Sequence, residues 1–286
     1  MNTIWKLAHN RSLRLGPQAV IMGILNVTPD SFSDGGLHVS LAAAVARAKS
    51  MLTEGASIID VGGESTKPNA EPVSAAEEQR RVIPVIEALA VVPDVLISID
   101  TYREETARLA VKAGAHIVND VWGLQREPGI ATVAAETGAG LCIMHTGRGR
   151  DLLDDAIEDQ RVFLRRSLEI ATKAGIDDQR IVLDPGFGFA KEETIDNVAL
   201  MARFRELTDL GFPLLAGTSR KRFLGNLTGR DAPDRDVATA ASSAILRLAG
   251  ADIFRVHNVA FNRDALALAD AMLEAKRSPG KPSARG

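Results

Sequence analysis

Several side chains that can form hydrogen bonds or carry charge stand directly at the ends of short apolar stretches. Asp100, Asn119 and Asp184 each close one such stretch. A carboxylate can accept two parallel N–H bonds from the amidine-like edge of a flat heterocycle, and a nearby amide can meet another edge of the same ring. Nothing in their spacing demands the alternative, a metal cage. These residues therefore indicate a binding site for a small, nitrogen-rich ring.

Cationic residues follow the last two apolar stretches. The seventh stretch runs into GTSRKRFLG, which contains Lys221 between two arginines, and the eighth carries Arg255 and His257. If these stretches are strands of an α/β barrel, the loops behind them commonly bind phosphate through backbone N–H groups and cations. We therefore expect an anion site here, with a merely solvated basic face as the alternative.

Two polar segments are expected to lie over the ligand. Residues 23–36 read GILNVTPDSFSDGG and pass from an apolar stretch into turn formers and small polar side chains. Residues 62–72, GGESTKPNAEP, follow the second apolar stretch. Both are typical of mobile loops that cover binding sites. Asn26, at the start of the first loop, could orient a hard cation such as Mg²⁺, although a lone Asn is more often a turn residue.

The spacing of the apolar stretches predicts the scaffold. They are rich in Ile and Val, which suits parallel strands buried on both faces. They lie at residues 19–25, 57–61, 95–99, 116–119, 140–144, 180–184, 213–217 and 253–257. Apolar residues recur with helical spacing at residues 40–56, 74–90, 104–115, 157–175, 194–211, 236–251 and 261–275. This alternation predicts an α/β protein with a single-domain (β/α)8 TIM barrel, and an open doubly wound sheet is the alternative.

Length, composition and charge narrow the class of protein. The 286 residues suit one barrel at residues 19–275, with a lead-in at 1–18 and a mobile polar tail at 276–286. A net charge of -3 argues against a general nucleic-acid binder. No apolar run approaches the roughly 20 residues of a membrane span, and the single cysteine, Cys142, allows no internal disulfide. We expect no nucleic-acid or membrane partner and a cytoplasmic location.

Familiar catalytic motifs are absent from the sequence. It contains no HExxH zinc motif, no GxSxG nucleophile elbow, no Walker A sequence and no GxGxxG turn after a first strand. The chemistry must therefore come from the charged and polar residues at the strand ends. Asp60 and Asp120 also close apolar stretches, and we assign these two to helix caps or turns.

Eight motifs together identify a family. In order they read GILNVTPDSFSDGG, DVGGESTKP, ISIDTYR, IVNDVWG, MHTGRGR, LDPGFGFAK, GTSRKRFLG and FRVHNV. In order and spacing they resemble the bacterial dihydropteroate synthases of folate biosynthesis, over about residues 20 to 270. The resemblance implies condensation of 6-hydroxymethyl-7,8-dihydropterin pyrophosphate with 4-aminobenzoate, giving 7,8-dihydropteroate and pyrophosphate.

The resemblance also implies roles for individual residues. Four of them would hold the pterin deep in the barrel, with Asp184 on its guanidine-like edge: Asp100, Asn119, Asp184 and Lys221. Arg255 and His257 would receive the pyrophosphate, and Val256 between them counts among the substrate-binding residues. Asn26 would help to place Mg²⁺ on the pyrophosphate.

The 4-aminobenzoate would lie beside Ser219 and the second loop, which contains Thr66 and Lys67. Sulfonamides resemble this substrate and would displace it. Two departures from the family pattern fall here. Many relatives have Arg in place of Lys67, which offers a planar fork that Lys lacks. MHTGRGR also replaces the commoner MHMQG, so the shape of the aminobenzoate pocket and the sulfonamide sensitivity are not fixed by the resemblance.

The implied mechanism breaks the C–O bond of the pterin pyrophosphate before the amine attacks, through a pterin-methyl cation. The implied catalytic residues are Asp34, Asp100, Lys221, Arg255 and His257. Asp34 and Asp100 would support the cation, while Arg255, His257 and Mg²⁺ would neutralise the leaving pyrophosphate. The arylamine is already nucleophilic, so no strong general base is needed.

Two other functions remain open from the sequence. A methyltetrahydrofolate-dependent methyltransferase would share the pterin contacts but would have no use for a pyrophosphate site. A non-catalytic pterin-binding protein would not need mobile loops rich in Ser, Thr and Asp. The resemblance also implies a homodimer formed through helices near the C-terminal half.

Overall fold

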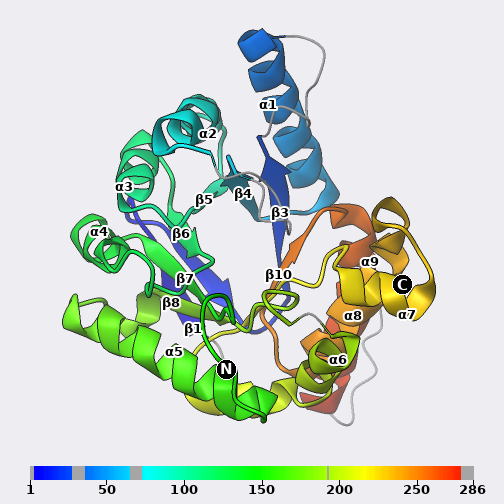
Figure 1. Cartoon of the computed structure of the whole chain (residues 1–286). Coiled ribbons are helices and arrows are strands. Elements are labelled where there is room, and N and C mark those ends of the chain that lie inside the picture. Colours follow the sequence, from blue (N-terminus) through cyan, green and yellow to red (C-terminus); the bar gives the residue numbers. More distant parts are fainter. Residues whose placement is uncertain (1–2, 28–35, 65–72, 192, 278–286) are drawn as a thin grey trace.

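The computed structural model describes residues 3–27, 36–64, 73–191 and 193–277. Within these residues, eight parallel strands form a barrel ringed by helices (Figure 1). The strands are β3 Val20–Asn26, β4 Ile58–Gly62, β5 Leu96–Asp100, β6 Ile117–Asp120, β7 Gly140–Met144, β8 Ile181–Asp184, β9 Leu215–Ala216 and β10 Ile253–Val256. Neighbours in the chain pair with each other, β3 also pairs with β10, and a parallel bridge between Leu183 and Leu214 closes the ring. The predicted TIM barrel is confirmed, and closure excludes the open sheet.

The first four barrel strands begin and end one residue later than predicted. Asn26, Asp100 and Asp120 are therefore the last residues of their strands. The shift matters for the site, because a side chain within a strand points either into the barrel or towards the helices, whereas a loop residue has no such constraint.

The helices follow the strands in turn. They are α1 Gly36–Glu54, α2 Ala75–Ala90, α3 Glu104–Ala113, α4 Gly129–Thr137, α5 Ala156–Lys173, α6 Thr194–Ala202, α7 Arg222–Thr228, α8 Asp236–Ala249 and α9 Val259–Arg277. The predicted helix at 194–211 is two elements, because α6 ends before a 3-10 segment at Phe204–Leu210. Among the described helices, none has the length and apolar character needed to cross a membrane.

Strand residues alternate between two apolar layers. Side chains such as Ile59, Ile97 and Leu141 point outward into the large core between the strands and the helices. Their strand neighbours Ile58 and Leu96 belong instead to a second cluster inside the barrel. This alternation follows from the two-residue period of a strand. It means that the polar residue two positions beyond Ile58 or Leu96 also faces the barrel interior.

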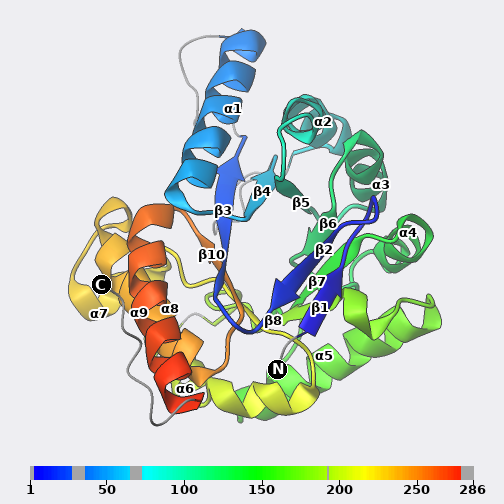
Figure 2. The same cartoon turned by 180° about the vertical axis from the view of Figure 1, so that it is seen from behind.

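A hairpin closes the end of the barrel opposite these polar residues (Figure 2). Its strands β1, Thr3–Lys6, and β2, Ser12–Leu15, pair antiparallel. Trp5, Leu7 and Leu15 are buried in the cluster inside the barrel, and the Trp5 indole N–H donates to the Arg180 carbonyl oxygen at 2.8 Å. Within the region predicted as a lead-in, this hairpin fills the strand N-terminal end with apolar side chains, so the polar opposite end is left for ligands.

One buried histidine at the hairpin end predicts how stability depends on pH. His116 Nδ1 accepts the Ile97 backbone N–H at 3.1 Å, so this nitrogen carries no proton. Burial lowers the pKa of His116 to about 4, and His9 and Arg11 add to the effect. Since the unfolded chain takes up this proton near pH 6.5, the contribution of His116 to stability is complete above that pH and is lost as the pH falls towards 4.

We expect His116→Gln to flatten this dependence, because Gln offers an acceptor and takes up no proton. The free energy of unfolding in urea, compared at pH 7.5 and pH 5, should change by about 2 kcal/mol less in the variant than in the wild type. An identical change in both proteins would contradict the assignment.

Candidate active site

Three polar side chains and one glycine occupy paired positions on four neighbouring strands at the open end of the barrel. The register pairs Asn26 of β3 with Gly62 of β4, Gly62 with Asp100 of β5, and Asp100 with Asn119 of β6. Paired residues on neighbouring parallel strands point to the same side of the sheet, so these positions all face the barrel interior. The structure thereby brings together three of the predicted site residues, Asn26, Asp100 and Asn119.

Arg255 crosses the barrel interior from β10 and binds two carboxylates. Its Nε donates to Asp60 Oδ2 at 2.6 Å, and its Nη2 donates to Asp100 Oδ2 at 2.5 Å. Asn119 Nδ2 also donates to Asp60 Oδ2, at 3.2 Å. The assignment of Asp60 to a cap or turn is wrong, because Asp60 lies two residues beyond Ile58 and faces the interior, where it is fully buried. Asp60 thus holds Arg255 in place from below the ligand site.

Asp184 and Arg255 lie at the same end of the barrel, on either side of the space above Gly217. A Cβ atom placed on Gly217 would stand 3.8 Å from Asp184 Oδ2 and 4.0 Å from Arg255 Cβ. The Asp184 carboxylate and the base of the Arg255 side chain therefore approach the same point, and the Arg255 charge acts on Asp184. The two residues are close enough to bind two parts of one small molecule.

The charges in this space are perturbed by burial. Burial raises the pKa of Asp184 to about 6, although the Gly186 N–H bond and the charges of Lys221 and Arg255 act against it. Burial likewise raises the pKa of Asp100, with Arg255 opposing. Burial lowers the pKa of Lys221 to about 8, and Arg255 lowers it further. Buried acids and bases whose pKa values are shifted towards 7 are typical of ligand and catalytic sites.

Lys221 forms one wall of the site together with the turn that follows β8. Its Nζ lies 4.0 Å from the centre of the Phe189 ring. Gly188, with φ +76, packs against the Lys221 stem, and a Cβ there would stand 3.1 Å from Lys221 Cδ. A cation over an aromatic face is favourable, so Phe189 helps to hold the Lys221 ammonium at the barrel mouth.

Ser219 fixes the orientation of the His257 imidazole. Ser219 Oγ accepts the His257 backbone N–H at 3.1 Å and lies 2.9 Å from His257 Nδ1. Burial lowers the pKa of His257 to about 3, and the charges of Arg220 and Arg255 contribute. The ring is therefore neutral. When the Ser219 O–H donates a hydrogen bond to Nδ1, the ring proton lies on Nε2. In this state His257 offers an N–H donor to an anion but no positive charge.

Arg220 does not contribute to the anion site that the sequence suggested for its segment. Its Nε and Nη2 donate to the two Asp236 oxygens at 2.8 and 2.9 Å. Such a two-pronged pair with a carboxylate holds the guanidinium firmly. Within the described residues, the positive charges that lower the pKa of Asp184 belong to Lys221, Arg255 and Lys191.

Val256 takes part in the core and not in the lining of the site. Its side chain is buried among the residues that pack the strands against the helices. Only the backbone of Val256 is therefore in a position to meet a ligand. Asp120 is a turn residue, as expected, because its carboxylate accepts the Trp122 and Leu124 backbone N–H groups at 2.8 and 2.6 Å.

The surroundings of Asn26 fit a magnesium ion that also binds the substrate. A Cβ on Gly62 would stand 3.6 Å from Asn26 Oδ1 and 3.7 Å from Asp100 Oδ2, so two oxygens lie close together here, and Asp100 Oδ2 also accepts from Arg255. Among the described residues, no group of three or more His, Cys, Asp or Glu side chains could hold a metal ion by itself. Mg²⁺ commonly takes one or two protein oxygens and completes its shell with phosphate and water.

Three of the predicted site residues lie outside the described residues. They are Asp34 in the first loop and Thr66 and Lys67 in the second. Their expected roles stay predictions.

The chain is similar to known proteins over most of its length. The model of the family described as pterin binding enzyme matches residues 22–257. Dihydropteroate synthase of Bacillus subtilis is 47% identical over 259 residues, covering 90% of this chain and 89% of that protein. The crystal structure of Xanthomonas albilineans dihydropteroate synthase with 4-aminobenzoic acid is 43% identical and has a TM-score of 0.89, covering 95% of this chain and 99% of the other.

A further structure of the Xanthomonas albilineans enzyme, in complex with 7,8-dihydropteroate, is 41% identical and has a TM-score of 0.84. It covers 94% of this chain and 98% of the other. Both solved structures are more than 40% identical to this chain over nearly its whole length. The same chain forms the barrel and carries the polar residues at its mouth. This chain therefore belongs to the pterin-binding enzymes and, among them, to the dihydropteroate synthase family of transferases.

Proposed function

We propose that this chain condenses 6-hydroxymethyl-7,8-dihydropterin pyrophosphate with 4-aminobenzoate and releases 7,8-dihydropteroate and pyrophosphate. The observation that carries the proposal is that Asp184 and Arg255 share the space beside Gly217 at the barrel mouth, where the charge of Arg255 acts on Asp184. A pterin edge on Asp184 and a diphosphate towards Arg255 use both charges of that space. Relatives that bind 4-aminobenzoic acid and 7,8-dihydropteroate support the identity of the acceptor and the product.

In the proposed mechanism, the pterin is held by hydrogen bonds to buried groups. The Asp184 carboxylate accepts two N–H bonds from the amidine-like edge, and Asn119 meets a neighbouring edge. Both residues are buried, so water competes poorly for these bonds. The closed end of the barrel, filled by apolar side chains, allows the ring to enter from one direction only.

The bond between the pterin methylene carbon and the diphosphate oxygen then breaks, and its electron pair leaves with the pyrophosphate. Arg255 and the His257 N–H stabilise the charge that grows on the leaving group. Mg²⁺, when bound beside Asn26, supplies Lewis-acid stabilisation of the same group. Asp100 supports the pterin-methyl cation electrostatically. The amine nitrogen of 4-aminobenzoate forms the new C–N bond and loses a proton.

The loops that carry Asp34, Thr66 and Lys67 are proposed to cover this site, with Asp34 near the cation and Lys67 near the aminobenzoate carboxylate. Ser219 is proposed to border the same substrate. Ser219 already binds His257, so it would align the aminobenzoate pocket with the pyrophosphate pocket. Displacement of 4-aminobenzoate by sulfonamides belongs to this proposal.

The proposal includes a homodimer formed through the last helices. Exposed apolar residues support it: Val237 and Ile245 on α8 and Leu268 on α9 are 74%, 54% and 67% exposed. The two helices pack side by side, so these residues belong to neighbouring elements. Exposed apolar residues on neighbouring helices are typical of subunit contacts. Light scattering should give twice the 30.5 kDa mass of one chain, and a monomer would contradict this part.

The reaction is tested by measuring pyrophosphate release from the purified protein. We expect release only when pterin pyrophosphate, 4-aminobenzoate and Mg²⁺ are all supplied. Reactions that lack the acceptor serve as controls for simple hydrolysis. No release above background with all components present would remove the proposal. A methyltransferase, the alternative on the same fold, would release no pyrophosphate under any of these conditions.

A further inference from the structure

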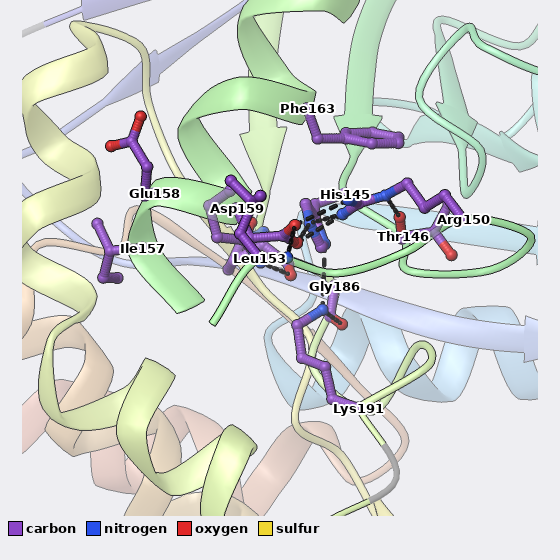
Figure 3. A network of polar contacts seen from close by, with 12 residues as sticks. His145, Thr146, Arg150, Leu153, Ile157, Glu158, Asp159, Phe163, Gly186 and Lys191 are labelled. Carbon is purple, nitrogen blue, oxygen red and sulfur yellow. Dashed lines mark hydrogen bonds and ion pairs between the residues drawn. The ribbon is translucent and has the colours of Figure 1, made fainter. Parts of the chain in front are cut away.

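A buried polar network lies behind the turn that follows β8. Lys191 is 8% exposed and reaches from this turn towards His145 at the end of β7 (Figure 3). Asp159 of α5 and Arg150 of the preceding loop lie on either side of the imidazole (Figure 3). None of these residues has a role in the mechanism above. Burying a lysine costs free energy, so its position calls for a physical reason.

The contacts fix the protonation state of His145. Lys191 Nζ donates to His145 Nδ1 at 3.1 Å, which leaves the ring proton on Nε2, 2.8 Å from Asp159 Oδ2. Arg150 Nη2 lies 2.7 Å from the same ring nitrogen. Arg150 holds the same carboxylate with bonds of 2.7 and 2.5 Å. Burial lowers the pKa of His145 to about 4, so the ring is neutral and accepts from the lysine. The network therefore forms a rigid socket for the Lys191 ammonium.

Lys191 connects this socket to the carboxylate of the ligand site. Its Nζ donates to the Gly186 carbonyl oxygen at 2.9 Å, and the Gly186 N–H donates to Asp184 Oδ1 at 2.7 Å. These two bonds hold the peptide groups on both sides of Gly186. Gly186 has φ +63 and lies against the His145 carbonyl oxygen, so the turn depends on a left-handed conformation that glycine adopts readily.

We propose that Lys191 is a positioning residue for pterin recognition, which holds the Gly186 turn so that its N–H orients and supports the Asp184 carboxylate. The inference rests on the proposed function of Asp184. Lys191 does not touch the ligand in this account. It acts through Gly186, and its positive charge also favours the ionised form of Asp184.

This arrangement makes recognition sensitive to pH near neutrality. Burial lowers the pKa of Lys191 to about 7. Among the charged groups that face it, Asp184 and Asp159 raise this pKa, whereas Lys221 and Arg150 lower it. As the pH rises through 7, Lys191 loses its charge, the bond to Gly186 weakens and Asp184 loses electrostatic support. Pterin affinity should therefore decline on the alkaline side.

The test compares Lys191→Met with Lys173→Met, a matched control at the exposed end of α5. The probe is 6-hydroxymethyl-7,8-dihydropterin, which lacks the diphosphate, and its binding is measured by calorimetry from pH 6 to pH 9. We expect affinity about tenfold weaker in Lys191→Met at pH 6.5. The loss of affinity between pH 6.5 and 7.5 should be absent in this variant, whereas the loss around pH 8 that comes from Lys221 should remain. The KM for 4-aminobenzoate should change less than about twofold, whereas a general structural defect would alter both.

A second variant keeps the proposal testable if Lys191→Met does not fold. Asp159→Asn removes a charge that raises the pKa of Lys191. The alkaline decline in pterin affinity should then begin at a lower pH, by about half a unit. Pterin affinity within twofold of the wild type in Lys191→Met, or an unshifted profile in Asp159→Asn, would overturn the inference. Failure of the wild type to bind the pterin would instead remove the proposed function.

Discussion

Replacing Asp184 by alanine is expected to weaken binding of the dihydropterin by about a hundredfold or more. The carboxylate is buried at the end of β8 and accepts one backbone N–H from its own turn, which leaves acceptor capacity for the ligand. Loss of two charge-assisted hydrogen bonds leaves ring donors unpaired in a buried site, a cost of about 3 kcal/mol. Calorimetry with the pterin measures the effect. Asp178→Ala, at an exposed turn, is the matched control.

The same residue predicts an acid limit for pterin binding. Because burial raises the pKa of Asp184 to about 6, the wild type should lose affinity as the pH falls below that value and the carboxylate takes up a proton. Asp184→Asn keeps one acceptor for the Gly186 N–H but cannot titrate, so its weaker affinity should be constant across this range. Unchanged affinity in either variant would show that the pterin does not bind Asp184.

Replacing Arg255 by methionine should remove most of the activity and much of the stability. Removal of the guanidinium takes away the cation at the leaving group, for which we expect kcat/KM to fall by about a hundredfold to a thousandfold. It also leaves Asp60 and Asp100 buried without their cation. Breaking such a buried pair costs about 3–5 kcal/mol. Denaturant unfolding and steady-state kinetics measure the two effects separately.

A double variant separates these two consequences. Arg255→Met with Asp60→Asn removes one of the two buried carboxylates that have lost their cation. The raised pKa of Asp100 allows the other to take up a proton. We expect stability to recover in part and activity to remain low. Arg203→Met, which breaks surface ion pairs with Asp155 and Glu206, should cost no more than about 1 kcal/mol. Recovery of activity in the double variant would refute the role of Arg255 at the leaving group.

The barrel was predictable because its strands are short, apolar and rich in Ile and Val, and because helices with clear spacing separate them. The polar residues at the barrel mouth were predictable because the carboxyl ends of all parallel strands lie at the same end of a barrel. Asp60 shows where this reasoning failed. Asp60 lies before the end of its strand, and the two-residue period of SIIDV, with Ile58 inside the barrel, places Asp60 inside as well.

Other features depend on contacts that no local pattern contains. The partner of Arg220 is Asp236, and the socket of Lys191 joins residues from β7, α5 and the turn after β8. The hairpin at residues 3–15 is stabilised by packing into the barrel, as the burial of Trp5 indicates. The break near Arg203 between α6 and the 3-10 segment lies within continuous helical spacing, so tertiary contacts override the local preference there.

A crystal structure of the protein with 6-hydroxymethyl-7,8-dihydropterin pyrophosphate, 4-aminobenzoate and Mg²⁺ tests the central claim most directly. We predict the amidine-like edge of the ring on the Asp184 carboxylate and the diphosphate, or released pyrophosphate, within hydrogen-bond distance of Arg255 and His257. A pterin ring outside the barrel mouth, or an anion bound away from Arg255, would contradict the account.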